Sequence, residues 1–308
     1  MAGLGTNKYT LFGIMAILLW SCVIALTRDI AELFGPIGGA ALMYSVSTLA
    51  LMLVMGRPKI GEYRLSYVLL GGGLFVSYEI CLALALGMAN DRQQAMEMAV
   101  INYLWPALTV LLAVAMSGRR VNLLVYPSVV LAFVGVVWCI SGDASFSIEG
   151  VKNNVATNPL TYSMAFAAAF IWALYCNITP KMSGGKNAIV LFFAMTSVTL
   201  WIQYALSDER QMVYTFSSVF TLLLAGIIMG AGYALWNQAI IGGNMVLIAT
   251  FSYFTPVFST VFSSLYLSVA LTQSFWKGVA LVTLGSLLCA WATREREADN
   301  KAANASEQ

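Results

Sequence analysis

The sequence predicts an all-α integral membrane protein in which ten transmembrane helices form two inverted five-helix repeats, with both termini in the cytoplasm. Three observations lead to this fold class: an apolar composition, a succession of long apolar segments, and a motif that recurs after 150 residues. Hydrophobic residues make up 60% of the chain and charged residues 10%, and the mean hydropathy is +0.80. A soluble domain carries about 25% charged residues, so this chain has too few to cover a globular surface.

Apolar windows of about 20 residues, enough to cross about 30 Å of hydrocarbon, occur ten times in the chain. The first window follows Lys8 and is longer than the core of a typical signal peptide, so we expect it to be retained as a span. The connections are short, and none of them is long enough for a soluble domain. The ten expected spans are 9–27, 36–55, 66–86, 95–116, 121–140, 160–179, 187–206, 216–240, 245–267 and 274–293.

The positive charges predict the orientation of these spans. With the N-terminus in the cytoplasm, eleven of the sixteen lysines and arginines fall on the cytoplasmic side and five on the other side, as the positive-inside rule requires. An even number of spans then returns the C-terminus to the cytoplasm. The polar tail REREADNKAANASEQ, residues 294–308, is expected to remain disordered.

An internal repeat divides the chain. The segment NYLWPALTVLLA, residues 102–113, resembles SYFTPVFSTVFS, residues 252–263, with Pro106 aligned to Pro256. Each copy holds five spans, and because five is odd the second copy enters the membrane from the opposite side, which is the inverted repeat of many transporters. The expected units are a first repeat at 9–140, an extracytoplasmic connecting loop at 141–159, a second repeat at 160–293 and a cytoplasmic tail at 294–308.

Composition excludes several function classes. The chain has no histidine, and its five cysteines lie far apart without a C-x-x-C spacing, so we expect no metal site, no disulfide and no cofactor. A net charge of +2 implies no nucleic-acid partner. An intramembrane enzyme needs paired acids, histidine with a metal, or serine with a base, and none of these pairings is present at membrane depth. The expected partners are therefore the lipid bilayer and a small-molecule substrate, and no obligate protein partner is implied.

Glu79 is the one acid deep inside a predicted span, in the stretch GGGLFVSYEICLALAL. An ionisable group at this depth is costly unless it is paired or reached by water. Three interpretations stay open: a site for a ligand amine or a proton, a buried hydrogen-bond anchor between helices, and a cavity-facing residue without a specific role. Ala234 occupies the matching position of the second repeat. Adjacent helical residues point about 100° apart, so Tyr78 and Glu79 need not share a face.

Prolines and glycines suggest how the spans bend and pack. Pro106 and Pro256 lie at matched positions in the fourth and ninth spans and are interpreted either as paired hinges or as static kinks. Small residues allow helices to approach closely. The functional interpretation of this packing is that the third and eighth spans slide against each other. The glycines assigned to helix packing are Gly71, Gly72, Gly73, Gly226 and Gly230.

Aromatic and amide side chains gather at mid-span depth. Interfacial belts explain tryptophans at span ends, but they do not explain those in the middle of a span, such as Trp20 and Trp172. Asn102 and Asn177 lie at a similar depth. Rings and amides together suit a ligand with a flat apolar body and a polar head, whereas for each residue alone a helix–helix contact is the simpler interpretation.

Several motifs then resemble a known family. The segments GGAALMYSVS, FVSYEICLALALG, NYLWP, FIWALYC and SYFTPV are similar to those of the drug/metabolite transporter superfamily, in its two-domain, EamA-type, ten-helix branch. Within that branch the chain resembles the bacterial inner-membrane exporters of aromatic amino acids, over residues 9–293. The resemblance implies a substrate cavity between the two repeats, lined at the matching positions by Trp20, Tyr78, Tyr103, Trp105, Trp172 and Tyr233.

The resemblance also implies an activity. The expected function is export of aromatic and other hydrophobic amino acids, and of hydrophobic cationic compounds, by alternating access through the central cavity. The alternative is a broad-specificity drug or metabolite efflux protein, or a channel-like uniporter for another small metabolite. Thr255 stands where the first repeat has Trp105, which makes one wall of the expected cavity less aromatic and the surroundings of the two prolines less symmetric.

Overall fold

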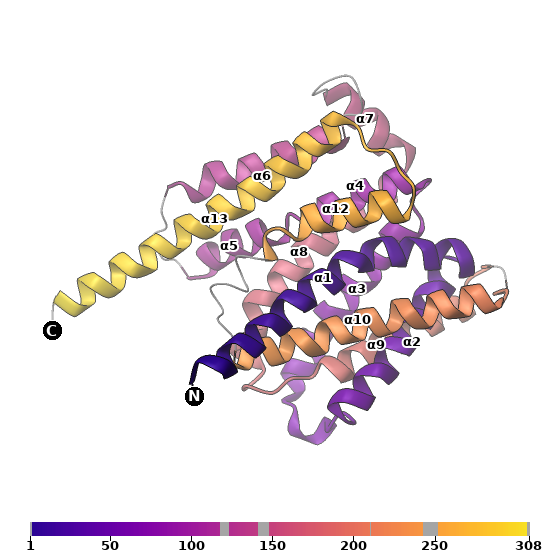
Figure 1. Cartoon of the computed structure of the whole chain (residues 1–308), viewed down its shortest axis with the longest axis horizontal. Helices are drawn as coiled ribbons and strands as arrows, with labels where there is room; N and C mark the ends of the chain where they lie inside the picture. The colour runs from indigo at the N-terminus through magenta and orange to yellow at the C-terminus, as the bar shows by residue number, and fades with distance from the viewer. Residues whose placement is uncertain (1, 118–122, 141–147, 210, 243–251, 307–308) are drawn as a thin grey trace.

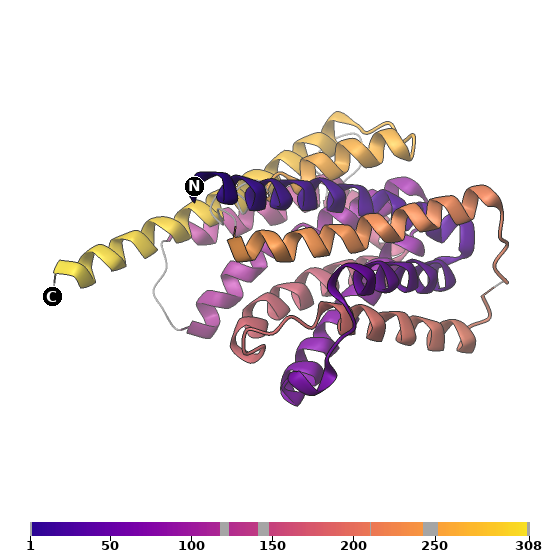
Figure 2. The same ribbon diagram turned by 60° about the horizontal axis from the view of Figure 1, so that its bottom comes forward.

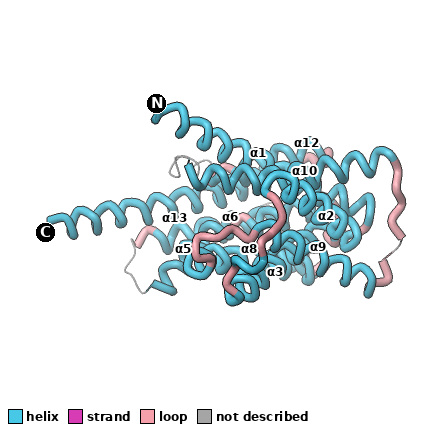
Figure 3. The backbone as a smooth tube through the Cα atoms, turned by 90° about the horizontal axis from the view of Figure 1, so that it is seen from below, coloured by secondary structure: helices cyan, strands magenta, loops and turns pink. Residues whose placement is uncertain are grey.

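The structure, a computed structural model, describes residues 2–117, 123–140, 148–209, 211–242 and 252–306. Within these ranges all regular secondary structure is helical (Figure 3). The helices are α1 Ala2–Phe34, α2 Pro36–Met55, η1 Ile60–Glu62, η2 Tyr67–Gly71, α3 Gly72–Gly87, α4 Arg92–Asn102, α5 Trp105–Ser117, α6 Val125–Ile140, α7 Ile148–Thr157, α8 Pro159–Met182, α9 Ile189–Leu206, α10 Phe216–Gly242, α12 Thr255–Tyr266 and α13 Gln273–Ser306.

Six helical segments in the described ranges are long and apolar enough to cross a membrane, against the ten spans predicted. The expected fourth span is divided between α4 and α5, α6 has 16 residues, and the first part of the expected ninth span, 245–251, lies outside the described residues. The qualifying segments are Lys8–Phe34, Pro36–Met55, Tyr67–Gly87, Pro159–Thr179, Ile189–Leu206 and Phe216–Trp236. The chain is therefore a multi-pass membrane protein whose described part is all-helical.

Two helix breaks occur at matching places. The chain forms a turn at Tyr103–Leu104, between α4 and α5, and another at Tyr253–Phe254, directly before α12. Pro106 and Pro256 each follow as the second residue of the next helix. Proline is well tolerated there, because the first-turn N–H groups have no intrahelical partner. The two prolines therefore lie in the first turns of α5 and α12, and for Pro106 the expectation of one continuous helix through the fourth span is corrected.

Two polar segments are more helical than the sequence predicts. The connecting segment 141–159 contains α7, and the tail expected to be disordered continues α13 as far as Ser306, beyond the bundle (Figure 1). The tail is rich in alanine, glutamate, arginine and lysine, which have high helix propensity. Disorder predicted from low hydrophobicity was wrong here, because helix formation needs no apolar face when propensity and an existing helix support it.

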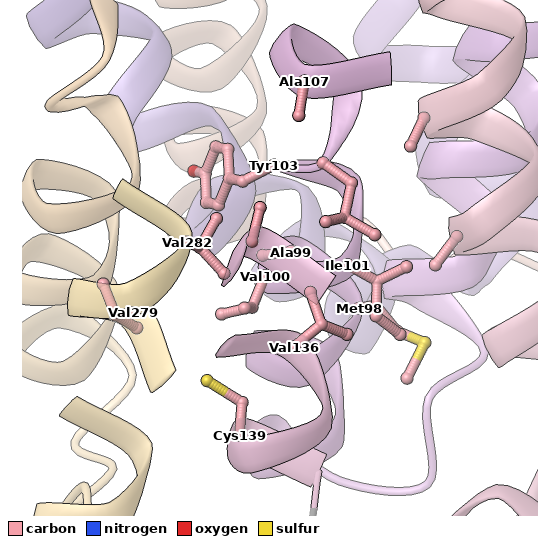
Figure 4. Packing of buried hydrophobic residues seen from close by; sticks show 14 of the residues in the cluster. Met98, Ala99, Val100, Ile101, Tyr103, Ala107, Val136, Cys139, Val279 and Val282 are labelled. Atoms are coloured by element: carbon pink, nitrogen blue, oxygen red, sulfur yellow. The ribbon is translucent and has the colours of Figure 1, made fainter. Parts of the chain in front are cut away.

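The helices pack in long pairs. α6 lies along α13, α1 along α10, α2 along α9 and α3 along α8 (Figures 1 and 2). Gly135 and Gly285 make the α6–α13 approach possible, since a Cβ on either would lie 2.7 Å from backbone atoms of the other helix. Figure 4 shows the core beside this pair, with Cys139 of α6 facing Val279 of α13 and Val136 of α6 near Val100 of α4.

The glycines predicted to pack do so against other partners than expected. A Cβ on Gly72 would lie 3.1 Å from side chains of α9, and one on Gly230 would lie 3.1 Å from the Ser47 carbonyl of α2. Gly226 likewise faces Val46 of α2, and Gly71 faces Tyr67. Gly73 is exposed and a Cβ there would meet nothing within 4 Å, so its assignment to packing is corrected. These contacts pair the glycines of α3 with α9 and those of α10 with α2, so the glycines of α3 and α10 do not face each other.

Candidate functional site: a central aromatic cavity

A cavity of about 270 Å³ lies at the centre of the bundle. Side chains of α1, α3, α8 and α10 form most of its wall, and both helix breaks border it through Tyr103 and Tyr253. Helix breaks are tolerated at membrane depth where the backbone is buried in protein or lines a cavity. This location therefore explains why the chain keeps the breaks.

All six residues predicted to bind substrate line this one cavity. They come from α1, α3, the α4–α5 break, α5, α8 and α10, and they are Trp20, Tyr78, Tyr103, Trp105, Trp172 and Tyr233. Pro106 and Pro256 also border it, one at each helix break. Residues more than 200 positions apart in the sequence thus meet at one site.

Ring contacts organise the wall in two groups. On one side Trp172 lies 4.5 Å from Tyr78, centroid to centroid, and stacks on Tyr175 at 5.0 Å with an interplanar angle of 19°. On the other side Trp20 contacts Trp236 at 5.0 Å and Tyr233 at 5.1 Å. Such distances fall in the favourable range for aromatic pairs. The rings therefore support one another as two preformed apolar surfaces.

Glu79 lies in the cavity wall and is 2% exposed. Its Oε2 accepts a hydrogen bond of 2.5 Å from the Tyr44 hydroxyl of α2, and its Oε1 accepts one of 2.8 Å from the Tyr233 hydroxyl of α10. The carboxylate therefore joins three helices and also borders the cavity. Tyr78 borders the same cavity. The adjacent residues Tyr78 and Glu79 therefore both line this cavity, a point that helical geometry alone left undecided.

Tyr44 is one of the cavity residues that sequence reasoning missed. It is fully buried in α2 and reaches both the cavity and Glu79. The signal available was its mid-span position within the motif GGAALMYSVS. Thr27 of α1 and Ser286 of α13 also line the cavity, and nothing in their sequence surroundings distinguishes them from other small polar residues in apolar spans.

A polar network lies beyond the Leu86 end of the cavity. Arg28 donates to the carbonyl oxygens of Leu86 and Ala89, at 3.1 and 2.7 Å, and Arg28 Nε donates to Glu32 Oε1 at 2.8 Å. Arg92 donates to Glu32 Oε2 at 2.6 Å. The network therefore fixes the end of α1 against the turn that follows α3 and the start of α4.

Arg92 extends this network to the second half of the chain. Its Nη1 donates to the Leu267 carbonyl, just after α12, at 2.8 Å, and nearby Tyr266 donates to Asp29 of α1 at 2.8 Å. The hydrogen bond to the Glu32 carboxylate raises the pKa of Arg92 above its ordinary value. These contacts hold the ends of α1, α4 and α12 together at one end of the bundle.

A second, more polar cavity of about 440 Å³ is separate from the first. It is lined by Glu97, Gln94, Asn154 and Tyr162 among others. Glu97 is 6% exposed and accepts a hydrogen bond of 2.5 Å from the Tyr162 hydroxyl. Glu97 and Glu79 are thus two buried carboxylates that each accept from tyrosine, in different cavities.

A bundle of apolar helices around an aromatic cavity defines a membrane carrier for small molecules. The EamA-like transporter family matches residues 159–291. Two proteins named aromatic amino acid exporter YddG are similar to this chain: that of Salmonella typhimurium (strain 14028s / SGSC 2262) is 44% identical over 291 residues, 94% of this chain and 99% of the relative. That of Escherichia coli (strain K12) is 45% identical over 288 residues, covering 94% and 98%.

A more distant relative of the same name, from Ancylobacter novellus, is 25% identical over 264 residues, 83% of this chain and 87% of the relative. A solved structure titled "Crystal structure of protein" has a TM-score of 0.66 at 23% identity, covering 93% of this chain and 97% of its own, and so supports the fold. The chain belongs to the EamA-like transporter family, and it is a transporter and not an enzyme.

Proposed function

We propose that this protein exports aromatic and other hydrophobic amino acids across the bacterial cytoplasmic membrane by alternating access, with the central cavity as its substrate site. The observation that carries the proposal is that six aromatic residues from both halves of the chain border one cavity. Small-molecule sites are mostly apolar, with a few placed polar groups. A cavity of this chemistry suits a flat apolar ring that carries a polar head.

Relatives support the same substrate class. The two proteins at 44% and 45% identity are both named aromatic amino acid exporters, and the chain matches nearly their whole length. Phenylalanine, tyrosine and tryptophan are therefore the first substrates to test, followed by leucine as an aliphatic comparison.

Two inverted five-helix repeats are the architecture we propose, with ten spans. The helix pairs support it. If the two repeats are exchanged, α1 takes the place of α8 and α3 that of α10, so the pair α1–α10 becomes the pair α8–α3. The pairs α2–α9 and α6–α13 each remain the same pair. The breaks at Tyr103–Leu104 and Tyr253–Phe254 also correspond. Alternating-access carriers often consist of such repeats, with discontinuous helices at the binding site.

The boundaries and orientation follow from this architecture. The first repeat covers 9–140 and the second 160–293, joined by the extracytoplasmic segment 141–159 and followed by the cytoplasmic tail 294–308. The family match to 159–291 coincides with the second repeat, which supports that boundary. The excess of lysine and arginine on the side of the N-terminus supports cytoplasmic termini.

Alternating access assigns a mechanical role to the helix breaks. In the proposal the two halves rock about the cavity, and α5 and α12 change their angle to the rest of their halves. Pro106 and Pro256 act as hinges because each leaves one carbonyl of the preceding turn without a backbone donor. The network of Arg92, Glu32 and Leu267 closes the extracytoplasmic end.

Vesicle transport tests the proposed function. Purified protein is reconstituted into liposomes loaded with radiolabelled phenylalanine, tyrosine or tryptophan, and efflux is compared with protein-free liposomes. We expect saturable efflux that unlabelled aromatic amino acid on the other side accelerates, because a carrier returns faster when it is loaded. Efflux without such acceleration would indicate a channel-like uniporter, and no efflux above protein-free liposomes for any of the three would overturn the proposal.

A further inference from the structure

The cavity contains one charged side chain. Among the described residues that line it, Glu79 is the single acid and no lysine or arginine is present. The four ion pairs of the described residues all lie elsewhere, on α1 and α4 and on the loops around Glu62. A buried carboxylate without a cationic partner is costly, so the cavity has a site that a cation would stabilise.

The tyrosines hold this carboxylate without neutralising it. Tyr44 and Tyr233 each donate one hydrogen bond to a different oxygen of Glu79, at 2.5 and 2.8 Å. A carboxylate offers about four lone-pair sites, so one site remains on each oxygen. Because α2 and α10 fix the two donors, the orientation of the carboxylate is set before any ligand arrives, and the entropic cost of binding is smaller.

The same cavity holds further polar atoms that have no hydrogen-bond partner in the described part of the chain. One is an acceptor, the Oδ1 of Asn102, which is 4% exposed and belongs to the last residue of α4. Another is a donor, the indole Nε1 of Trp20. Buried polar groups are normally paired, so these atoms indicate a ligand with both donors and acceptors.

An amino acid has this combination. Its ammonium group carries three N–H donors, which suit the free lone pairs of Glu79 and the Asn102 oxygen, and its carboxylate suits the Trp20 N–H. We propose that Glu79 is the ammonium subsite of the cavity. Through Glu79 the protein selects compounds that carry a free amine as well as an aromatic ring. This inference rests on the proposed function and names the part of the substrate that the single charge recognises.

Charge-assisted hydrogen bonds contribute more than neutral ones, so losing the amine has a measurable cost. Radiolabelled tryptophan transport in liposomes is competed with phenylalanine, 2-phenylethylamine and 3-phenylpropanoate. With the unmodified protein we expect 3-phenylpropanoate, which lacks the amine, to compete about 10-fold more weakly than phenylalanine or worse. If 3-phenylpropanoate and phenylalanine compete equally well, the inference is overturned. This comparison uses the unmodified protein and requires no variant.

The variant Glu79→Gln keeps the shape of the side chain and removes the charge. We expect the preference for phenylalanine over 3-phenylpropanoate to fall to about threefold or less. The matched control is Glu97→Gln, which alters a buried carboxylate that also accepts from a tyrosine but borders the other cavity, and we expect it to keep the full preference. If Glu79→Gln does not fold, Glu79→Asp retains the charge, and we expect it to keep the preference with weaker binding of phenylalanine.

Failure of this inference is distinguishable from failure of the proposed function. Absence of tryptophan transport by the unmodified protein overturns the proposed function. Transport with an unchanged amine preference in Glu79→Gln overturns the ammonium subsite alone. A Glu79→Gln protein that loses its dependence on a pH gradient but keeps the amine preference assigns Glu79 to proton coupling, which also overturns the subsite.

Discussion

The rings of Tyr78 in α3 and Trp172 in α8 lie 4.5 Å apart, centroid to centroid, with their planes tilted by 32°. They belong to different halves of the chain and face the same cavity. Trp172 also meets Trp105 edge to face, at 6.5 Å and 88°. In the proposed site, a substrate ring at this wall would contact surfaces from both proposed repeats, which is what a site between two moving halves requires.

Replacing Trp172 by alanine should weaken the binding of aromatic substrates. The change removes a ring that contacts Tyr78, Trp105 and Tyr175, and aromatic pairs contribute about 0.5–1.5 kcal/mol beyond area burial. We expect the half-saturation concentration for tryptophan to rise about 10-fold, with a smaller rise for leucine. Phe170→Ala, on the exposed face of the same helix, is the control. An equal effect of both variants would contradict a binding role for Trp172.

Loosening the polar network should open the extracytoplasmic end. Arg92→Gln breaks the contacts to Glu32 and to the Leu267 carbonyl. The reporter is Thr27→Cys, a buried cavity position of α1, in a protein whose natural cysteines are replaced. We expect a membrane-impermeant thiol reagent added outside to label it about 5-fold faster when Arg92 is changed. Lys152→Gln, an exposed cation of α7, should leave the rate unaltered, and a rise with both changes argues against the closure.

The two prolines should affect turnover and not binding. Alanine at 106 supplies an N–H that can donate to the Asn102 carbonyl, which favours a continuous helix through the break. If the break is a hinge, Pro106→Ala and Pro256→Ala each lower the maximal rate about threefold or more, with the half-saturation concentration preserved. Pro127→Ala, in the first turn of α6, is the control. Full turnover in both variants leaves the prolines with a static role.

The two networks at opposite ends of the bundle should differ in their contribution to stability. Glu32→Gln leaves Arg28, which is buried, without its charged partner, and we expect a loss of about 1–3 kcal/mol. Glu62→Gln breaks an exposed pair with Lys186, 2.8 Å apart, and exposed pairs contribute little. Thermal unfolding in detergent compares the two. A larger fall in melting temperature for Glu62→Gln would contradict this order.

The pH dependence of the exposed pair has a definite sign. The hydrogen bond from Lys186 holds the pKa of Glu62 below its ordinary value. A carboxyl with a lowered folded-state pKa contributes stability above its unfolded pKa and loses it as the pH falls through the folded pKa. We therefore expect any difference in melting temperature between the native protein and Glu62→Gln to be present at neutral pH and to vanish in acid. A difference that grows on acidification would contradict the assignment.

Much of this protein is determined by its sequence alone. Hydropathy is a local property, so windows of the chain suffice to place α1, α2, α3, α8, α9 and α10 and the class of membrane protein. The positions of Trp20 and Trp172 at mid-span depth likewise pointed to a ring-lined cavity, and both line it. Polar segments were less predictable, since the helix of the C-terminal tail depends on propensity and on the helix it continues.

Tertiary structure alone decided which groups meet. Glu79 lies 35 residues from Tyr44 and 154 from Tyr233, and Arg92 lies 175 from Leu267. No sequence window contains such pairs, because a hydrogen-bond partner is set by which helix faces are packed together and not by spacing along one helix. For the same reason the glycines of α3 and α10 were recognised as small residues, but their partners α9 and α2 were not. The sequence determined that a carboxylate lies buried among apolar helices, and packing determined that two tyrosines hold it at the edge of the cavity.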